Sequence, residues 1–191
     1  PPDDRHRQRH GELGHSVAAR LGDEPVKRPG GQLAHAGDHR LSALRGEVAG
    51  EVHVFKGIPY ALAPTGTGRW KPPVAVPPWT GVRDATQFGP ACVQPKSRPG
   101  SLYADDPPAM SEDCLSLNVW APKDARSAPV FVWIHGGALT TVFNSQTLYD
   151  GTRLAEHGVV VVSINYRLGI LGYLAHPQLS AESSQKISGN Y

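Results

Sequence analysis

The sequence predicts an α/β fold that starts with antiparallel strands and continues into a parallel βαβ unit. Two near-continuous apolar runs, residues 129–135 and 158–165, have the length and β-branched content of buried strands. A helical segment that ends at Gly158 lies between them, and this spacing is typical of a βαβ crossover. We therefore expect parallel strands that are covered on both faces of the sheet.

The antiparallel part is predicted from shorter segments. Residues 46–50 and 51–56 form two strand patterns about Gly50, the second of which alternates apolar and polar residues. Residues 115–120 alternate again and predict a further strand, which Pro122 ends.

The segment between these strands, residues 58–90, is rich in proline and glycine and is predicted to be irregular. Its aromatic rings need cover, so we expect them to pin the segment onto the core. The rings belong to Tyr60, Trp70, Trp79 and Phe88.

Composition excludes several classes of protein. Of the 191 residues, 39% are hydrophobic and 19% are charged, which is enough apolar material for a core. The net charge of +2 is not concentrated in one block, so no nucleic-acid or anionic-membrane surface is expected. No apolar run is long enough to span a bilayer.

The chain divides into residues 1–43 and residues 44–191. The first part mixes His, Arg, Asp, Gly and Pro, and we interpret it as a disordered or non-native tail. Two histidine pairs in it have i, i+4 spacing, but no third ligand accompanies them, so no metal site is expected. These pairs are His6 with His10 and His35 with His39.

Cys92 and Cys114 are the two cysteines of the chain. They form no CxxC motif and offer no four-ligand zinc set. From the residues alone, one disulfide and two buried free thiols are both open. The cellular compartment is also open: a cysteine pair favours a secreted or periplasmic location, whereas no signal-peptide pattern is present.

The chemistry is concentrated where the apolar strand 129–135 runs into Gly136 and Gly137. In open α/β sheets, ligands bind at the carboxyl ends of the strands. Two glycines there place no side chain in the way, and successive N–H groups can point at one oxyanion. The alternative interpretation is an ordinary tight turn.

Further motifs make this interpretation specific. They are Phe55-Lys56-Gly57-Ile58-Pro59-Tyr60-Ala61, Gly68-Arg69-Trp70, Trp79-Thr80-Gly81-Val82, Phe88-Gly89-Pro90-Ala91-Cys92, Ser111-Glu112-Asp113-Cys114-Leu115-Ser116-Leu117-Asn118-Val119, Tyr149-Asp150-Gly151 and Asn165-Tyr166-Arg167-Leu168-Gly169. In this order they resemble the N-terminal part of type-B carboxylesterases, which have the α/β-hydrolase fold. The resemblance covers residues 44–191.

The resemblance implies a serine esterase that hydrolyses small carboxylic esters through an acyl-enzyme and needs no metal or organic cofactor. It assigns the oxyanion hole to the N–H groups of Gly136 and Gly137, with a third donor from the residue after the nucleophile. It gives His135 a structural role and not that of the base. The oligomeric state stays open.

Two residue pairs are also implied by the resemblance. Cys92 and Cys114 match the first disulfide of the family. Arg69 and Glu112 match a structural ion pair of the family, whose loss would leave a partner uncompensated if it is buried.

The catalytic triad is expected beyond Tyr191, because the sequence holds no Gly-x-Ser-x-Gly motif. We therefore expect these residues alone to be inactive, and the strand that ends at His135 to lack the neighbour that the nucleophile strand provides. Two alternatives are a non-catalytic cholinesterase-like binding or adhesion domain and a non-functional truncated product.

The sequence departs from the family at two places. Residues 139–145 contain no glycine, although family members usually have one in this loop, so a different loop shape is expected. The segment between Cys92 and Cys114 contains no Trp and only one aromatic residue, Tyr103. A cholinesterase, which places a choline-binding Trp there, is therefore not supported.

Overall fold

A computed structural model describes residues 43–97, 100, 105–107 and 109–191. Residues 1–42 of the predicted tail, its histidine pairs and Tyr103 lie outside the described residues, whereas Ala43, the last residue of that tail, begins a short strand.

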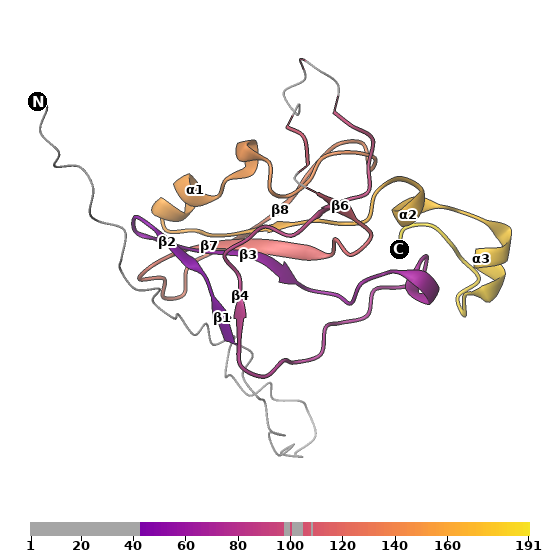
Figure 1. Cartoon of the computed structure of the whole chain (residues 1–191), viewed down its shortest axis with the longest axis horizontal. Helices are drawn as coiled ribbons and strands as arrows, with labels where there is room; N and C mark the ends of the chain where they lie inside the picture. The colour runs from indigo at the N-terminus through magenta and orange to yellow at the C-terminus, as the bar shows by residue number, and fades with distance from the viewer. Residues whose placement is uncertain (1–42, 98–99, 101–104, 108) are drawn as a thin grey trace, which may run out of the picture.

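The main sheet has five strands in the order β2-β3-β7-β9-β8 (Figure 1). The neighbours from β2 to β9 are antiparallel, and β8 is parallel to β9. The predicted change from antiparallel to parallel pairing is therefore confirmed. The bounds are β2 Glu47–Ala49, β3 Val52–Pro59, β7 Ser116–Pro122, β8 Val130–Ile134 and β9 Val160–Ile164.

The predicted hairpin about Gly50 is present, but its second strand continues past residue 56 to Pro59. The register shifts between Phe55 and Ile58. At this irregularity the amide of Gly57 donates to Oδ1 of Asn118, at 2.9 Å. A buried side chain thus replaces the ladder bond that the irregularity removes, which lets β3 stay paired with β7.

The helix of the crossover, α1 (Thr152–Glu156), packs against β3, β7 and β9 (Figure 1). Gly158 follows it with φ +87°, a left-handed conformation that ends the helix as predicted. Beneath α1 lies one apolar cluster, formed by Val52, Val54, Trp120, Ala155 and Val161. The βαβ unit of the sequence prediction is therefore confirmed.

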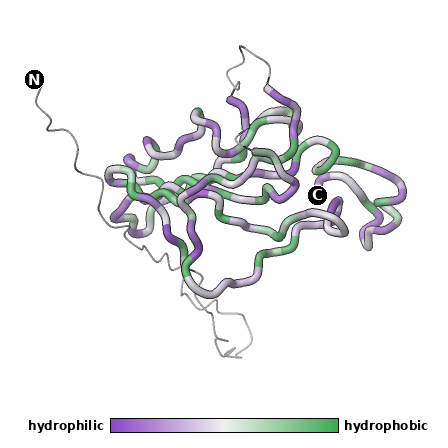
Figure 2. The backbone as a smooth tube through the Cα atoms, viewed as in Figure 1, coloured by the Kyte–Doolittle hydropathy of each residue, from purple (hydrophilic) through white to green (hydrophobic). Residues whose placement is uncertain are grey.

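Strand β8 differs from its prediction, because it is not covered on both faces. Val130, Val132 and Ile134 are 62%, 52% and 61% exposed. The strand lies at the edge of the sheet, and β9 is its only strand partner within the described residues. Figure 2 shows hydrophobic segments along the central strands, and at β8 this apolar character reaches the surface. The open edge itself agrees with the expectation from the family resemblance.

The proline-rich segment is mostly irregular, as predicted, and three of its rings hydrogen-bond to the body of the fold. Tyr60 Oη donates to the carbonyl of Asn165 at 2.7 Å. The indole N–H groups of Trp70 and Trp79 donate to backbone carbonyls at 2.8 and 3.1 Å. Phe88 is the exception, because its side chain stays 40% exposed beside the ammonium of Lys56.

Several short elements were not predicted. Two-stranded sheets join β1 to β4 and β5 to β6, both parallel. No helix in the described ranges is both long and apolar enough to cross a membrane. The bounds are β1 Ala43–Arg45, β4 Val82–Asp84, β5 Ala91–Cys92, β6 Met110–Ser111, α2 Gly169–Tyr173 and α3 Pro177–Glu182, with 3₁₀ turns η1 Gly66–Gly68 and η2 Thr147–Tyr149.

Candidate active site

The glycine loop, residues 135–142, begins where β8 ends. One side chain holds its first two carbonyl groups. Tyr166, just beyond β9, donates from Oη to the carbonyls of His135 at 2.7 Å and Gly136 at 3.3 Å. The Nδ1 atom of His135 also lies 3.0 Å from the Gly136 carbonyl. The parallel pairing of β8 and β9 places Tyr166 here, because both strands end at the same edge.

The carbonyl of Gly137 is held from the other side of the loop. The amides of Thr140 and Thr141 donate to it at 3.0 and 3.1 Å. Their hydroxyls reach the same oxygen at 3.1 and 3.2 Å. Four donors therefore converge on one carbonyl and fix the orientation of its peptide plane.

These anchored carbonyls determine where the amides point. In a trans peptide the N–H points opposite to the C=O of the same unit. The N–H groups of Gly136, Gly137 and Ala138 are therefore directed away from Tyr166 and the two threonines. Within the described part of the chain, none of the three donates a backbone hydrogen bond. Such a row of free donors at the end of a parallel strand is suited to an oxyanion.

The loop takes left-handed backbone conformations without the glycine that the family usually has. The φ angles of Ala138, Leu139 and Val142 are +53°, +62° and +80°. Each non-glycine residue in this region costs roughly 1–2 kcal/mol. The conformation persists because tertiary hydrogen bonds hold it, including one from the Gly169 amide to the Leu139 carbonyl at 2.7 Å.

His135 is buried, with 2% of its surface exposed, and its ring stacks on Tyr166 at a centroid distance of 4.5 Å. Burial lowers the pKa of His135, so the ring is neutral at pH 7. Since the Gly136 carbonyl only accepts, Nδ1 carries the proton. The ring thus supports the loop, in agreement with the structural role that the resemblance implies.

Cys92 and Cys114 form a disulfide, so the bridge implied by the resemblance is confirmed. It links residues 22 positions apart, and on the chain-entropy model a loop of this size is worth about 3 kcal/mol. Leu115 and Leu168 pack against it, together with the partly buried ring of Tyr166. The disulfide therefore supports Tyr166, the side chain that holds the start of the glycine loop.

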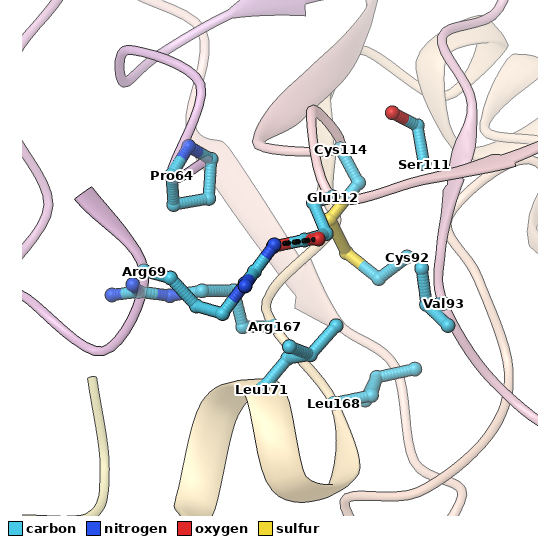
Figure 3. Close-up of a pocket in the computed structure, with 10 residues that line it drawn as sticks. All are labelled: Pro64, Arg69, Cys92, Val93, Ser111, Glu112, Cys114, Arg167, Leu168 and Leu171. Atoms are coloured by element: carbon cyan, nitrogen blue, oxygen red, sulfur yellow. Dashed lines mark hydrogen bonds and ion pairs between the residues drawn. A yellow bond between two sulfur atoms is a disulfide. The ribbon is translucent and has the colours of Figure 1, made fainter. Parts of the chain in front are cut away.

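Arg69 and Glu112 form a bidentate pair beside the disulfide (Figure 3). The two nitrogen–oxygen distances are 2.6 and 2.5 Å. The hydrogen bond and charge of Arg69 hold the pKa of the Glu112 carboxyl below its usual range. The pair fixes the proline-rich segment, through Arg69, to the disulfide loop, the segment from Cys92 to Cys114 that contains Glu112.

This pair predicts a pH dependence of stability. Because the pKa of Glu112 is lowered by folding, its stabilising effect is present above the unfolded pKa of about 4.3 and is lost as the pH falls through the folded value. Glu112→Gln should therefore lower stability at pH 6 and make unfolding less sensitive to acid between pH 5 and 3. Urea unfolding of the full-length protein at both ends of this range measures the effect.

Glu182→Gln is the control, because Glu182 and its partner Lys71 are 57% and 47% exposed and their pair is weakened by solvent. Its effect should be smaller. Equal acid sensitivity of wild type and Glu112→Gln would contradict the prediction.

Two pockets are found among the described residues. The one between the ion pair and the disulfide has a volume of about 10 Å³, room for one water molecule at most (Figure 3). The other is open to solvent, has a volume of about 370 Å³ and is lined in part by residues that come after the glycine loop in the sequence. Its walls are formed by Phe88, Asp105, Asp106, Phe143, Ser145 and Thr147. In the described part of the chain, no group of three His, Cys, Asp or Glu side chains could hold a metal ion.

Sequence reasoning missed the residues that orient the loop. Tyr166 lies 31 positions from His135, and the role of Thr140 and Thr141 depends on a fold-back of the chain onto Gly137. It also missed the outward-facing amide of Ala138. Of these, only Ala138 carried a signal, since it directly follows the two glycines.

Comparison with known proteins places these features in a family. The family model described as "Carboxylesterase family" matches residues 38–191. Fumonisin B1 esterase of Sphingopyxis macrogoltabida is 46% identical over 156 residues, which are 80% of this chain and 28% of that protein. Para-nitrobenzyl esterase of Bacillus subtilis (strain 168) is 46% identical over 133 residues, which are 69% of this chain and 27% of that protein.

Solved structures give the same result. A PNB esterase superimposes with a TM-score of 0.68 at 42% identity, covering 77% of this chain and 30% of that one. A carboxylesterase of Geobacillus stearothermophilus gives a TM-score of 0.64 at 46% identity, covering 75% of this chain and 28% of that one. The chain thus spans less than a third of the length of these relatives. With its partial α/β sheet, its glycine loop and these matches, the chain belongs to the carboxylesterase family.

Proposed function

We propose that the full-length protein containing this chain is a serine hydrolase of carboxylic esters, and that residues 44–191 supply its oxyanion hole. The observation that carries the proposal is the row of free amides at the end of β8, fixed by anchored carbonyls on the opposite side. The relatives that the comparisons name are esterases, which supports the same conclusion.

In this proposal a serine attacks the ester carbonyl and forms an acyl-enzyme, which water then hydrolyses. The amides of Gly136, Gly137 and Ala138 face the oxygen that becomes negative in each tetrahedral intermediate. Each such donor is typically worth about 3 kcal/mol in the transition state. The 191 residues hold no Gly-x-Ser-x-Gly motif, so the nucleophile, base and acid are proposed to lie outside them.

The chain's own residues perform the preorganisation. Tyr166 and the two threonines hold the carbonyls before substrate arrives, so the donors need no reorientation when charge develops. The neutral ring of His135 places no positive charge beside the loop.

The test uses the full-length protein with p-nitrophenyl butyrate and with a fluorophosphonate probe. We expect a burst of about one p-nitrophenol per active site, because an activated p-nitrophenyl ester acylates the serine faster than water hydrolyses the acyl-enzyme. The probe should label one serine and abolish turnover. A folded protein that neither turns over the ester nor reacts with the probe would instead support the non-catalytic binding domain.

A further inference from the structure

We propose that Gln94 is a positioning residue of the oxyanion hole and acts through Val142. The proposal rests on the esterase function proposed above, and it assigns a role in the reaction to a side chain of the disulfide loop.

The side chain of Gln94 binds one residue of the glycine loop in two directions. Its Oε1 accepts from the amide of Val142 at 2.6 Å, and its Nε2 donates to the Val142 carbonyl at 3.0 Å. The side-chain amide thus satisfies both backbone groups of a single residue, as a neighbouring strand does. Gln94 is itself buried, so water does not compete for these bonds.

Val142 needs such a partner because its backbone is strained. Its φ of +80° is an outlier for a β-branched residue, and its side chain is 4% exposed. Strain of this kind persists only where the surroundings over-determine the conformation. In the described part of the chain, Gln94 provides the hydrogen bonds to both backbone groups of this residue.

The position of Val142 is transmitted directly to the oxyanion donors. A Cβ added at Gly137 would lie 2.9 Å from Cγ2 of Val142 and closer still to the carbonyl oxygen of Thr141. The returning part of the loop therefore lies against Gly137, whose amide and the next one are the proposed donors. A displacement of Val142 would therefore remove the contact that restricts Gly137 and let its backbone shift.

Gln94 is well placed to act as a fixed point. It lies two residues after Cys92, whose carbonyl accepts from the same Nε2 at 3.1 Å. Cys92 is tied to Cys114 and belongs to the apolar cluster that also supports Tyr166. One rigid base thus holds the loop at both ends, through Tyr166 at its start and through Gln94 at its return.

A purely structural role predicts a different result from a positioning role. Loss of a structural hydrogen bond lowers stability and leaves the chemistry of the folded fraction unchanged. Displacement of oxyanion donors lowers transition-state binding without changing substrate binding, and an error of about 1 Å costs up to about 100-fold in rate.

The experiment compares wild type, Gln94→Leu and Gln94→Glu in the full-length protein with p-nitrophenyl butyrate. Leucine removes both bonds to Val142, whereas glutamate keeps the acceptor but places a buried carboxylate against the carbonyls of Cys92 and Val142. We expect kcat to fall about 10- to 100-fold for both variants, with KM within about twofold. Affinity for a trifluoromethyl ketone, which forms a tetrahedral adduct, should fall in parallel with kcat/KM.

Trp79→Phe is the matched control, because it removes a partly buried hydrogen bond from the Trp79 indole to the carbonyl of Ala43, which lies in β1 and not in the glycine loop. It should lose stability and keep kcat. A folded Gln94 variant with wild-type kcat and ketone affinity overturns the proposal, as does failure of both Gln94 variants to fold. Absence of ester turnover in the wild type is a separate result, since it overturns the proposed function and this inference with it.

Discussion

Replacement of Gly137 by alanine is expected to lower kcat for ester hydrolysis by about 100- to 1000-fold in the full-length protein, the loss typical of one oxyanion donor. Gly137 has φ +97°, and an added Cβ would overlap the carbonyl of Thr141 and approach Val142 at 2.9 Å. Either contact forces the loop to shift, which moves the amides of Gly137 and Ala138 together. The measurement is kcat and KM with p-nitrophenyl butyrate, and KM should change little.

Gly158→Ala separates this effect from the cost of a left-handed alanine. Gly158 has φ +87°, but a Cβ there meets no atom within 4 Å, and the residue ends α1 away from the glycine loop. We expect a stability loss of about 1 kcal/mol and unchanged kcat. Full activity in Gly137→Ala would contradict the assignment of the donors.

A polypeptide of these 191 residues, expressed alone, is expected to self-associate through β8. The strand has one free edge within the described residues, and Val130, Val132 and Ile134 are all more than half exposed on it. Unpaired apolar edges join other chains readily. Val132→Lys should shift the population toward monomer, because a charge on an edge strand opposes pairing. Light scattering coupled to size-exclusion chromatography measures the change.

Leu154→Lys is the control for added charge. Leu154 is 48% exposed, close to the 52% of Val132, but it lies on α1. This variant should associate as the wild-type polypeptide does. A wild-type polypeptide that purifies as a monomer and unfolds cooperatively would contradict the prediction.

The two predictions concern two parts of β8, the loop at its carboxyl end and its free edge. β8 delivers the glycine loop at its carboxyl end, and its orientation there depends on β9, because Tyr166 follows β9. The amides proposed as oxyanion donors are therefore organised by contacts among described residues, while the edge of the strand that presents them is open.

Local patterns were sufficient for the elements with strong periodicity. The strands at 46–56, 115–120, 129–135 and 158–165 were predicted to within a few residues, because apolar alternation and runs of β-branched residues report strand structure directly. The short elements α2, α3, β5 and β6 were not predicted, since two to six residues carry too little pattern. The prediction that β8 is buried on both faces was wrong, because burial depends on neighbours that the strand's own sequence does not encode.

The sequence by itself determined the α/β class, the strand that ends in Gly136 and Gly137, and the family to which the chain belongs. Only the tertiary structure decided how the loop is held: by Tyr166 from the next strand, by the two threonines that fold back on Gly137, and by Gln94 from the disulfide loop. The reason is the range of the interactions. Periodicity and glycine placement act over a few residues, whereas Gln94 and Val142 are 48 positions apart and meet only when the chain folds.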